Sequence, residues 1–356
     1  MKSVEFLLTV ECCRAAFDGG KSRKLAELTE AVDWDRFVRV ARYHRVQGLV
    51  WNGLQSSGAD VPDEIAASLS ADTKVIAASN LKALAEAGAM LAQFERAGIP
   101  ILFVKGLTLG ALAYPNPMLK MGWDIDILIG EGDLLRAAGE LEARGYRRMI
   151  PAPSADLKNW HQRSKESVWA RPEERLYVEL HTRLADNAEL ISGIGVDSPR
   201  QLVGAASGAA LPTLASDELF AYLCVHGASS LWFRLKWITD LAALLHHLPP
   251  GEIEALYDRS QQLGAGRAAA QALLHADDLY GTLAGTDLRQ RLQRDRVSRW
   301  LAAAAMKQVA GRDEPREPVT LPLGTAWIHL SQLLLRPGIR FKLGELMRQL
   351  RGMALG

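Results

Sequence analysis

Two aspartates stand inside a stretch that otherwise has the character of a buried strand. Asp124 and Asp126 alternate with apolar residues between Trp123 and Ile129. Because successive side chains of a strand point to opposite faces, Asp124, Asp126 and Leu128 are expected on one face, and the other residues, Trp123 among them, against a core. Two ionised carboxylates side by side in apolar surroundings repel each other, and a divalent cation with oxygen ligands, typically Mg²⁺, offsets that cost. A solvated edge strand with two surface acids is the alternative interpretation of so short a motif.

A third acid, Glu179, lies in a later apolar segment. Apolar runs at residues 167–170 and 176–180 flank a turn that contains a proline, and this pattern predicts an antiparallel hairpin. On the second arm, Tyr177, Glu179 and His181 share one face. Glu179 could instead pair with a nearby arginine. His181 is equally compatible with a hydrogen-bonded structural group and with an acid or base.

The chemistry depends on whether the strands that carry Asp126 and Glu179 are neighbours. If they are, three carboxylates converge, and such clusters typically hold two Mg²⁺ ions, about 3.5–4 Å apart, that assist an in-line displacement at phosphorus. The protein then contributes mainly position and positive charge. A large distance between Glu179 and the aspartates, or a basic side chain filling the gap between them, would overturn this catalytic interpretation.

The segments around these acids alternate between strand and helix. The sequence predicts a strand at 101–104, a helix at 107–112, the aspartate strand, a helix at 134–144, a strand at 146–150, a loop at 151–165 and the hairpin. We therefore expect an α+β protein whose central region, residues 98–205, contains a mixed β-sheet.

Both ends of the chain have helical spacing. Residues 1–97 form an expected N-terminal helical region that ends in a long helix over 72–97. Residues 206–356 form an expected C-terminal helical domain, with helices over 219–226, 231–247, 252–263, 268–280, 288–309 and 325–335. The last segment, 336–351, contains the basic residues Arg336, Arg340, Lys342, Arg348 and Arg351. A solvated helix face and a phosphate-binding role are its two interpretations.

Composition excludes several classes of protein. The chain has 356 residues, 48% of them hydrophobic and 23% charged, as is ordinary for a globular protein, and its formal net charge is +1. Near-neutral charge gives no electrostatic reason to expect nucleic acid or an anionic membrane as a partner. Its three cysteines, Cys12, Cys13 and Cys224, fit neither a disulfide framework nor a zinc site. No uninterrupted apolar run of about 18 residues occurs, so we expect no spanning helix and a cytoplasmic location.

The order of these motifs resembles a known superfamily. Lys105-Gly106, Tyr114, Asp124-Ile125-Asp126-Ile127-Leu128 and Glu179-Leu180-His181 follow one another as in the nucleotidyltransferases that share the DNA polymerase β catalytic core. Within that superfamily the chain is most similar to a poorly characterised bacterial family found near lasso-peptide and exopolysaccharide gene clusters. That family also carries a downstream H-G…W-x-R-L-K-W-x-x-D signature, which here spans His226 to Asp240. The match covers roughly residues 40 to 250.

The resemblance implies a fold, an activity and roles for particular residues. Residues 98–205 would form the nucleotidyltransferase core, with Asp124 and Asp126 as paired Mg²⁺ ligands and Glu179 as the third catalytic carboxylate. The reaction implied is transfer of a nucleoside monophosphate from an NTP, expected to be ATP, to a hydroxyl or phosphate of an unidentified acceptor. The superfamily usually has Gly-Ser or Gly-Gly where this chain has Lys105-Gly106. Gly106 still allows close backbone approach to a triphosphate, and Lys105 would supply a cation.

The downstream signature supplies second-tier candidates for nucleotide binding, namely His226, Arg234, Lys236 and Asp240. Arg234 and Lys236 are two residues apart, so on one helix they cannot share a face. Lys236 and Asp240 have the spacing of a helix-surface ion pair. The tryptophans of the signature, Trp232 and Trp237, are interpreted as core residues rather than as platforms for a base.

Other functions stay open at this point. A catalytically idle nucleotide-binding protein could keep the fold. The intact set of acids argues against this, because a chain that lost catalysis should lose these mutually repelling carboxylates first. A tailoring enzyme that transfers phosphate or phosphoryl groups to a peptide natural product is suggested by the lasso-peptide neighbourhood of the relatives. Toxin-like modification of RNA fits the charge less well. The acceptor, a peptide or a small molecule, is not determined by one sequence.

Overall fold

A computed structural model describes residues 2–19, 23–122, 124–204, 210–311, 317–318 and 325–353. Trp123, predicted to face the core, lies outside these residues. The chain divides into two compact units. The helical unit contains residues 1–74, 113–115 and 220–356, and the sheet unit contains residues 75–112 and 116–219. The N- and C-terminal helices, which the sequence analysis treated as separate regions, are thus grouped in one unit.

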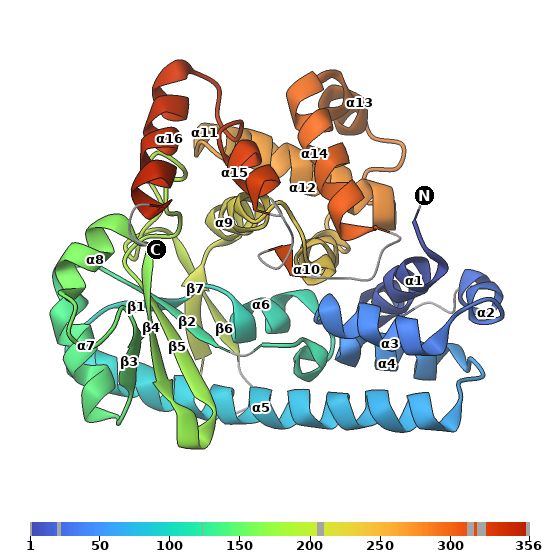
Figure 1. The fold of residues 1–356 in the computed structure, drawn as a ribbon, viewed down its shortest axis with the longest axis horizontal. Helices are drawn as coiled ribbons and strands as arrows, with labels where there is room; N and C mark the ends of the chain where they lie inside the picture. The colour runs from blue at the N-terminus through green and yellow to red at the C-terminus, as the bar shows by residue number, and fades with distance from the viewer. Residues whose placement is uncertain are drawn as a thin grey trace. The chain divides into compact units, whose positions relative to one another are not determined.

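The sheet unit is built on a five-stranded mixed sheet in the order β1-β2-β5-β4-β3 (Figure 1). Its strands are β1 (Ile101–Phe103), β2 (Ile125–Ile129), β3 (Arg147–Ile150), β4 (Glu166–Arg171) and β5 (Leu176–His181). The central pair, β2 and β5, is parallel, and the other pairs are antiparallel. This arrangement confirms the predicted α+β class with a mixed sheet.

The alternation of side chains decides which face of the sheet is the core. Ile125 and Ile127 lie opposite Val178 and Leu180 in the β2–β5 register, and all four are buried. They pack with apolar residues of α7 (Leu134–Ala143) and of the second half of α5 (Asp63–Arg96). Residues with the other parity, including Asp126 and Glu179, therefore point to the opposite face.

Two parts of the sheet unit differ from the prediction. Residues 151–165, predicted as a loop, contain the helix α8 (Leu157–Arg163), which begins where the Asp156 side chain accepts a hydrogen bond from the Asn159 backbone N–H. Its two turns are too short for a clear helical pattern. A second, two-stranded sheet of β6 (Arg200–Gly204) and β7 (Ala210–Leu214) was not predicted. Pro212 argues against a strand in sequence, but a two-stranded ribbon has free edges that tolerate it.

The helical unit contains α1 (Val4–Asp18), α2 (Arg23–Thr29), α3 (Trp34–Tyr43), α4 (Gln47–Ser57), the first part of α5, α9 (Ser216–Ser229, from Phe220), α10 (Leu235–Leu245), α11 (Pro250–Gln262), α12 (Gly266–Tyr280), α13 (Asp287–Arg294), α14 (Arg296–Val309), α15 (Ala326–Gln332) and α16 (Ile339–Met353). The helix predicted over 288–309 is in fact two helices, because Asp295 caps the start of α14. The helix predicted over 231–247 begins only at Leu235, since Leu231 and Trp232 adopt left-handed backbone conformations. Cys12, Cys13 and Cys224 are buried, free thiols.

Among the described residues, α5 is the one helix long and apolar enough to cross a membrane by length and composition. Its buried residues follow helical spacing along one stripe, from Ile65 and Leu69 through Ile76 to Leu84 and Phe94. Core helices of globular proteins meet the same length and composition criteria, so a single helix of this kind is weak evidence for a membrane span.

Candidate metal centre

The parallel pairing of β2 and β5 brings two of the predicted acids together. Asp126 lies directly opposite Glu179 in the register, and Leu128 lies opposite His181. Asp126, Glu179 and His181 therefore share one face, and one ligand atom from each lies within 4.8 Å of the others. The prediction that two separate strands place Asp126 beside Glu179 is confirmed.

His181 is an integral part of this cluster. The imidazole is fully buried, with Nε2 3.3 Å from Asp126 Oδ1 and 3.4 Å from Glu179 Oε2. Its Nδ1 faces Glu166 Oε2 at 3.3 Å, because β4 places Glu166 opposite His181. Burial and the charge of Lys165 lower the pKa of His181, but the surrounding carboxylates outweigh them, so the pKa is raised. The sequence showed that His181 shares a face with Glu179, whereas Glu166 carried no signal.

A basic side chain lies between the two acids. Lys105 Nζ is 2.7 Å from Asp126 Oδ1 and 3.5 Å from Glu179 Oε2. Burial raises the pKa of Glu179, but the charge of Lys105 and hydrogen bonds with His181 and Asp126 lower it far more, so the pKa is well below its usual value. Phosphate contact by Lys105 stays a prediction, and in this structure its ammonium fills the gap between the two acids, the arrangement that was expected to overturn the catalytic interpretation. The structure thus contains a compensated charge cluster in place of an open pair of carboxylates.

Gly106 and Asp124 lie beside this cluster. Gly106 begins α6 (Gly106–Ala113) with a φ of +56°, a left-handed conformation that side chains disfavour. A Cβ at this position would lie 3.4 Å from the backbone oxygen of Asp124 and 4.0 Å from Asp126 Oδ2. The glycine therefore keeps the backbone close to the acids, and its predicted approach to a triphosphate stays a prediction. Asp124 precedes β2 and is not one of the three clustered residues, so its role as a ligand stays a prediction.

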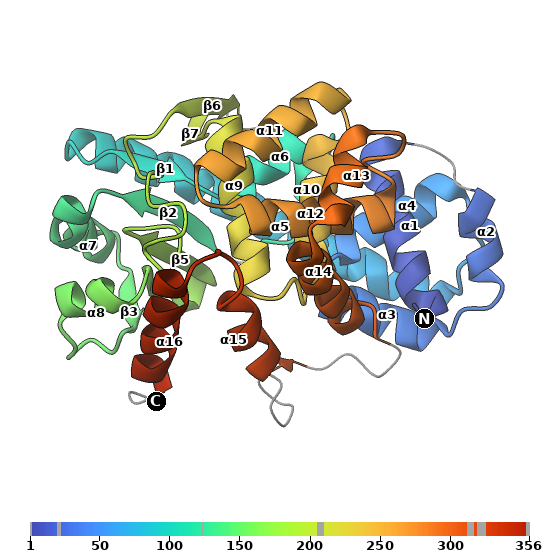
Figure 2. The same ribbon diagram turned by 90° about the horizontal axis from the view of Figure 1, so that it is seen from above.

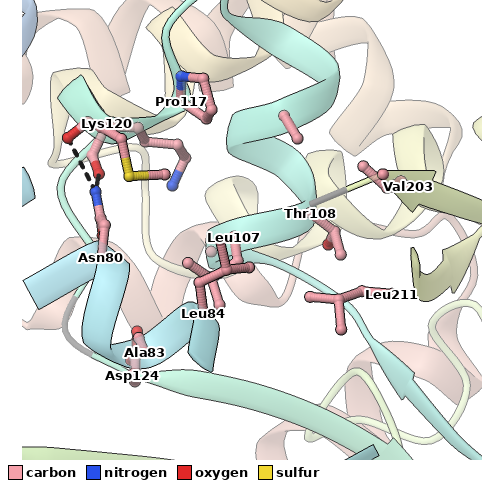
Figure 3. A pocket seen from close by; sticks show the side chains of 15 residues that line it. Asn80, Ala83, Leu84, Leu107, Thr108, Pro117, Lys120, Asp124, Val203 and Leu211 are labelled. Carbon is pink, nitrogen blue, oxygen red and sulfur yellow. Dashed lines mark hydrogen bonds between the residues drawn. The ribbon is translucent and has the colours of Figure 1, made fainter. Parts of the chain in front are cut away.

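A narrow cavity opens next to Gly106 and Asp124 (Figure 3). Most of its lining is apolar, and its lining residues come from α5, α6, the segment before β2, β6 and β7. Asn80 helps to shape it by donating hydrogen bonds to the carbonyls of Met118 (3.1 Å) and Lys120 (2.8 Å). Its volume of ≈ 40 Å³ has room for about three water molecules. A nucleotide pocket of several hundred Å³ would require this region to open.

The downstream signature forms a helix–turn–helix within the helical unit, from the end of α9 to α10. Trp232 is fully buried, and a Cβ on Gly227 would lie only 2.3 Å from its indole ring. The Trp232 backbone N–H also donates to the Gly227 carbonyl at 2.8 Å. The glycine and the tryptophan of the signature are therefore explained by packing, and the interpretation of Trp232 as a core residue is confirmed.

The other residues of the signature also make contacts inside the helical unit. Arg234 precedes α10, donates to the Tyr43 carbonyl and pairs with Glu317, and its guanidinium carbon lies 4.5 Å from the centroid of the Tyr43 ring. Asp240 is buried, and its Oδ1 accepts a hydrogen bond from the Tyr114 hydroxyl at 2.8 Å.

Two residues of the signature differ from the expectation. Arg234 does not belong to the helix that contains Lys236, and Asp240 is not at the helix surface.

The ring of His226 meets that of Trp237 edge to face, with the two ring centroids 5.3 Å apart. Nucleotide binding by His226, Arg234, Lys236 and Asp240 stays a prediction.

Comparison with known proteins identifies the group to which these motifs belong. Residues 30–281, more than two thirds of the chain, match the family model for uncharacterised nucleotidyltransferases. No curated protein and no solved structure matches the chain.

Proposed function

The chain belongs to the uncharacterised nucleotidyltransferase family, and from this membership we propose that it transfers a nucleoside monophosphate from an NTP to an acceptor. ATP is the expected donor, and a hydroxyl or phosphate of a peptide or small molecule is the expected acceptor. The observation that carries the proposal is the direct pairing of Asp126 with Glu179 on adjacent parallel strands. Family membership supports the reaction class, and the register supports the position of the reacting groups.

The cluster fits a cation. The Lys105 ammonium contacts the carboxylates of Asp126 and Glu179, and this contact supports the proposal that the donor set accepts a positive charge. Asp126 and Glu179 would hold a divalent ion, with Asp124 and His181 as further candidates. Such an ion, when bound, polarises phosphoryl oxygens and lowers the pKa of an acceptor hydroxyl. Mg²⁺ is the expected ion, and the imidazole of His181 also makes the site suitable for Mn²⁺.

Glu166 supports His181 in this role. A ligating histidine commonly directs its second nitrogen to a carboxylate, which fixes the orientation of the ring. His181 Nδ1 lies 3.3 Å from Glu166 Oε2 without a hydrogen bond between them, and Nε2 points toward Asp126 and Glu179.

Lys105 would take one position in the absence of a divalent ion and another in its presence. On Asp126 its ammonium compensates the buried carboxylate, whose side chain is 1% exposed. A divalent ion would take over that compensation, and the flexible lysine side chain would then be available for the triphosphate. Gly106 lies at the first turn of α6, where backbone N–H groups can donate hydrogen bonds to an anion without interference from a Cβ.

A second candidate is a nucleotide-binding protein without catalysis. The observation that favours it is the position of Lys105, because an ammonium that permanently neutralises Asp126 and Glu179 would exclude a metal ion. The two candidates differ in whether a divalent ion can displace that ammonium.

Calorimetry and a pyrophosphate assay separate the candidates. For the enzyme, we expect Mn²⁺ or Mg²⁺ to bind the wild type and to strengthen ATP binding, and both effects to be lost in Asp126→Asn. Incubation with ATP and pooled acceptors should release pyrophosphate with the wild type and not with Asp124→Asn or Asp126→Asn. Glu131→Gln, at an exposed acid, is the matched control. The proposed mechanism would be ruled out if the affinity for ATP is the same with and without divalent ions, or if turnover persists in both aspartate variants.

A further inference from the structure

The C-terminal helix α16 has an inverted pattern of burial. Beside the apolar Phe341, which is 3% exposed, its buried face contains two polar side chains, Glu345 and Gln349, which are 1% and 6% exposed. The Gln349 amide donates to Glu345 Oε1 and to the carbonyl of His329 in α15, each at 3.0 Å. Arg348 pairs with Glu345. The polar residues of α16 are thus satisfied within the helical unit, toward α15, its neighbour in Figure 2.

The exposed face of α16 is apolar. Ile339, Leu343, Leu346, Met347 and Leu350 are between 43% and 72% exposed. Their spacing of three or four residues places them on one stripe, about 100° wide at 100° per residue. The neighbouring α15 exposes Trp327 and Leu330 as well, at 52% and 42%. A helix that points its polar residues inward and its leucines outward presents a surface for a partner.

Basic residues flank the apolar stripe on both sides. At 100° per residue, Arg340 and Arg351 fall along one edge of the stripe and Lys342 falls along the other. None of the three has an ion pair within the described part of the chain. The acid of α16, Glu345, is buried and already paired, so the exposed face of the helix carries positive charge without negative charge. The net charge of +1 for the whole chain conceals this local concentration.

We propose that α16 binds the surface of a membrane that contains anionic lipids. A helix with this pattern lies in the plane of the interface, with its apolar stripe at the boundary between headgroups and acyl chains. The long arginine and lysine side chains at its edges reach the lipid phosphates while their apolar stems stay against the hydrocarbon. Positive charge along both edges matches a plane of negative charge. This inference is independent of the proposed transfer reaction.

Vesicle co-sedimentation with the full chain tests the proposal. We expect binding to vesicles of phosphatidylcholine mixed with phosphatidylglycerol, little binding to phosphatidylcholine alone, and weaker binding as salt is raised. The variant Leu343→Ser/Leu346→Ser/Leu350→Ser should lose binding, because it removes the stripe at exposed positions. Its matched control is Val75→Ser/Leu81→Ser, two exposed apolar residues of α5 that are 61% and 54% exposed.

The basic residues are tested separately. Each one removed should weaken binding about fivefold, so Arg340→Gln/Lys342→Gln/Arg351→Gln should weaken it roughly a hundredfold. The matched control, Lys74→Gln/Lys158→Gln/Arg163→Gln, removes three exposed charges elsewhere and should leave binding unchanged. Circular dichroism checks that every variant is folded.

Three outcomes would overturn the inference. The first is absence of binding to anionic vesicles by a folded wild type, and the second is equal loss of binding in the control variants. The third is a wild-type chain that does not bind vesicles but forms a dimer in light scattering, with the dimer lost in the leucine variant. That result would assign the stripe to contact between two copies of the chain.

Discussion

Replacement of Lys105 by methionine tests whether the ammonium occupies the position of a cation. The change keeps an unbranched side chain of similar length and removes the charge that lies 2.7 Å from Asp126 and 3.5 Å from Glu179. Asp126 and Glu179, opposite each other in the register, would then be left with His181 as their remaining charge partner in this cluster.

The magnitude follows from the burial of these groups. Removal of one partner from a buried ion pair typically destabilises a protein by roughly 3–5 kcal/mol. We expect the lower end, about 3 kcal/mol, because His181 still contacts both carboxylates and the Glu179 side chain is 23% exposed. A divalent ion at a hundred times its dissociation constant adds roughly 2.7 kcal/mol. Saturating Mn²⁺ or Mg²⁺ should therefore restore most of the loss, and the variant should bind the ion more tightly than the wild type.

The assay is urea unfolding near neutral pH, followed by circular dichroism, in EDTA and in each divalent ion, with calorimetry for metal affinity. Lys82→Met is the matched control, since Lys82 pairs with Glu174 at 3.5 Å on the surface, where the loss should stay below about 1 kcal/mol. If Lys105→Met is as stable as the wild type in EDTA, the ammonium does not compensate the acids. If the ion binds both proteins equally, lysine and metal do not share one position.

Three further predictions concern other parts of the molecule. Gly227→Ala should destabilise the protein by roughly 1–3 kcal/mol in urea unfolding, because the new methyl group overlaps the Trp232 indole, and a second change, Trp232→Phe, should recover part of that loss. His44 is buried, and burial followed by the charge of a neighbouring arginine lowers its pKa to about 3. A lowered histidine pKa means that the imidazole binds a proton less readily in the folded state than in the unfolded state. The contribution of His44 to the free energy of unfolding is complete above the unfolded-state pKa of about 6.5. It declines as pH falls toward 3, by roughly 2 kcal/mol between about pH 7 and pH 5. Unfolding of His44→Gln over this range should show a correspondingly shallower dependence on pH. Finally, Mn²⁺ bound to the wild type should show nitrogen coupling in its electron paramagnetic resonance spectrum, which His181→Gln abolishes, while Glu166→Gln should weaken Mn²⁺ binding roughly 10–100-fold. A nitrogen signal that survives His181→Gln would show that another residue supplies the nitrogen ligand.

The sequence by itself determined the properties that depend on local alternation. The period of two along a strand placed Asp126 on one face of β2 and Glu179 on one face of β5, and it assigned Ile125 to the core. The order of the motifs indicated the nucleotidyltransferase family, and Trp232 was interpreted as a core residue rather than as a platform for a base. The face assignments need only the residues adjacent to each position, and the family assignment needs only the order of motifs along the chain.

Only the tertiary structure decided how the charges are paired. The sequence carried no signal that Lys105 would reach Asp126, or that β4 would bring Glu166 to His181. Such pairs depend on strand order and register, which are set by packing between segments far apart in the chain. The exposed apolar stripe of α16 could not be predicted either. An amphipathic pattern does not say which face of a helix the fold covers.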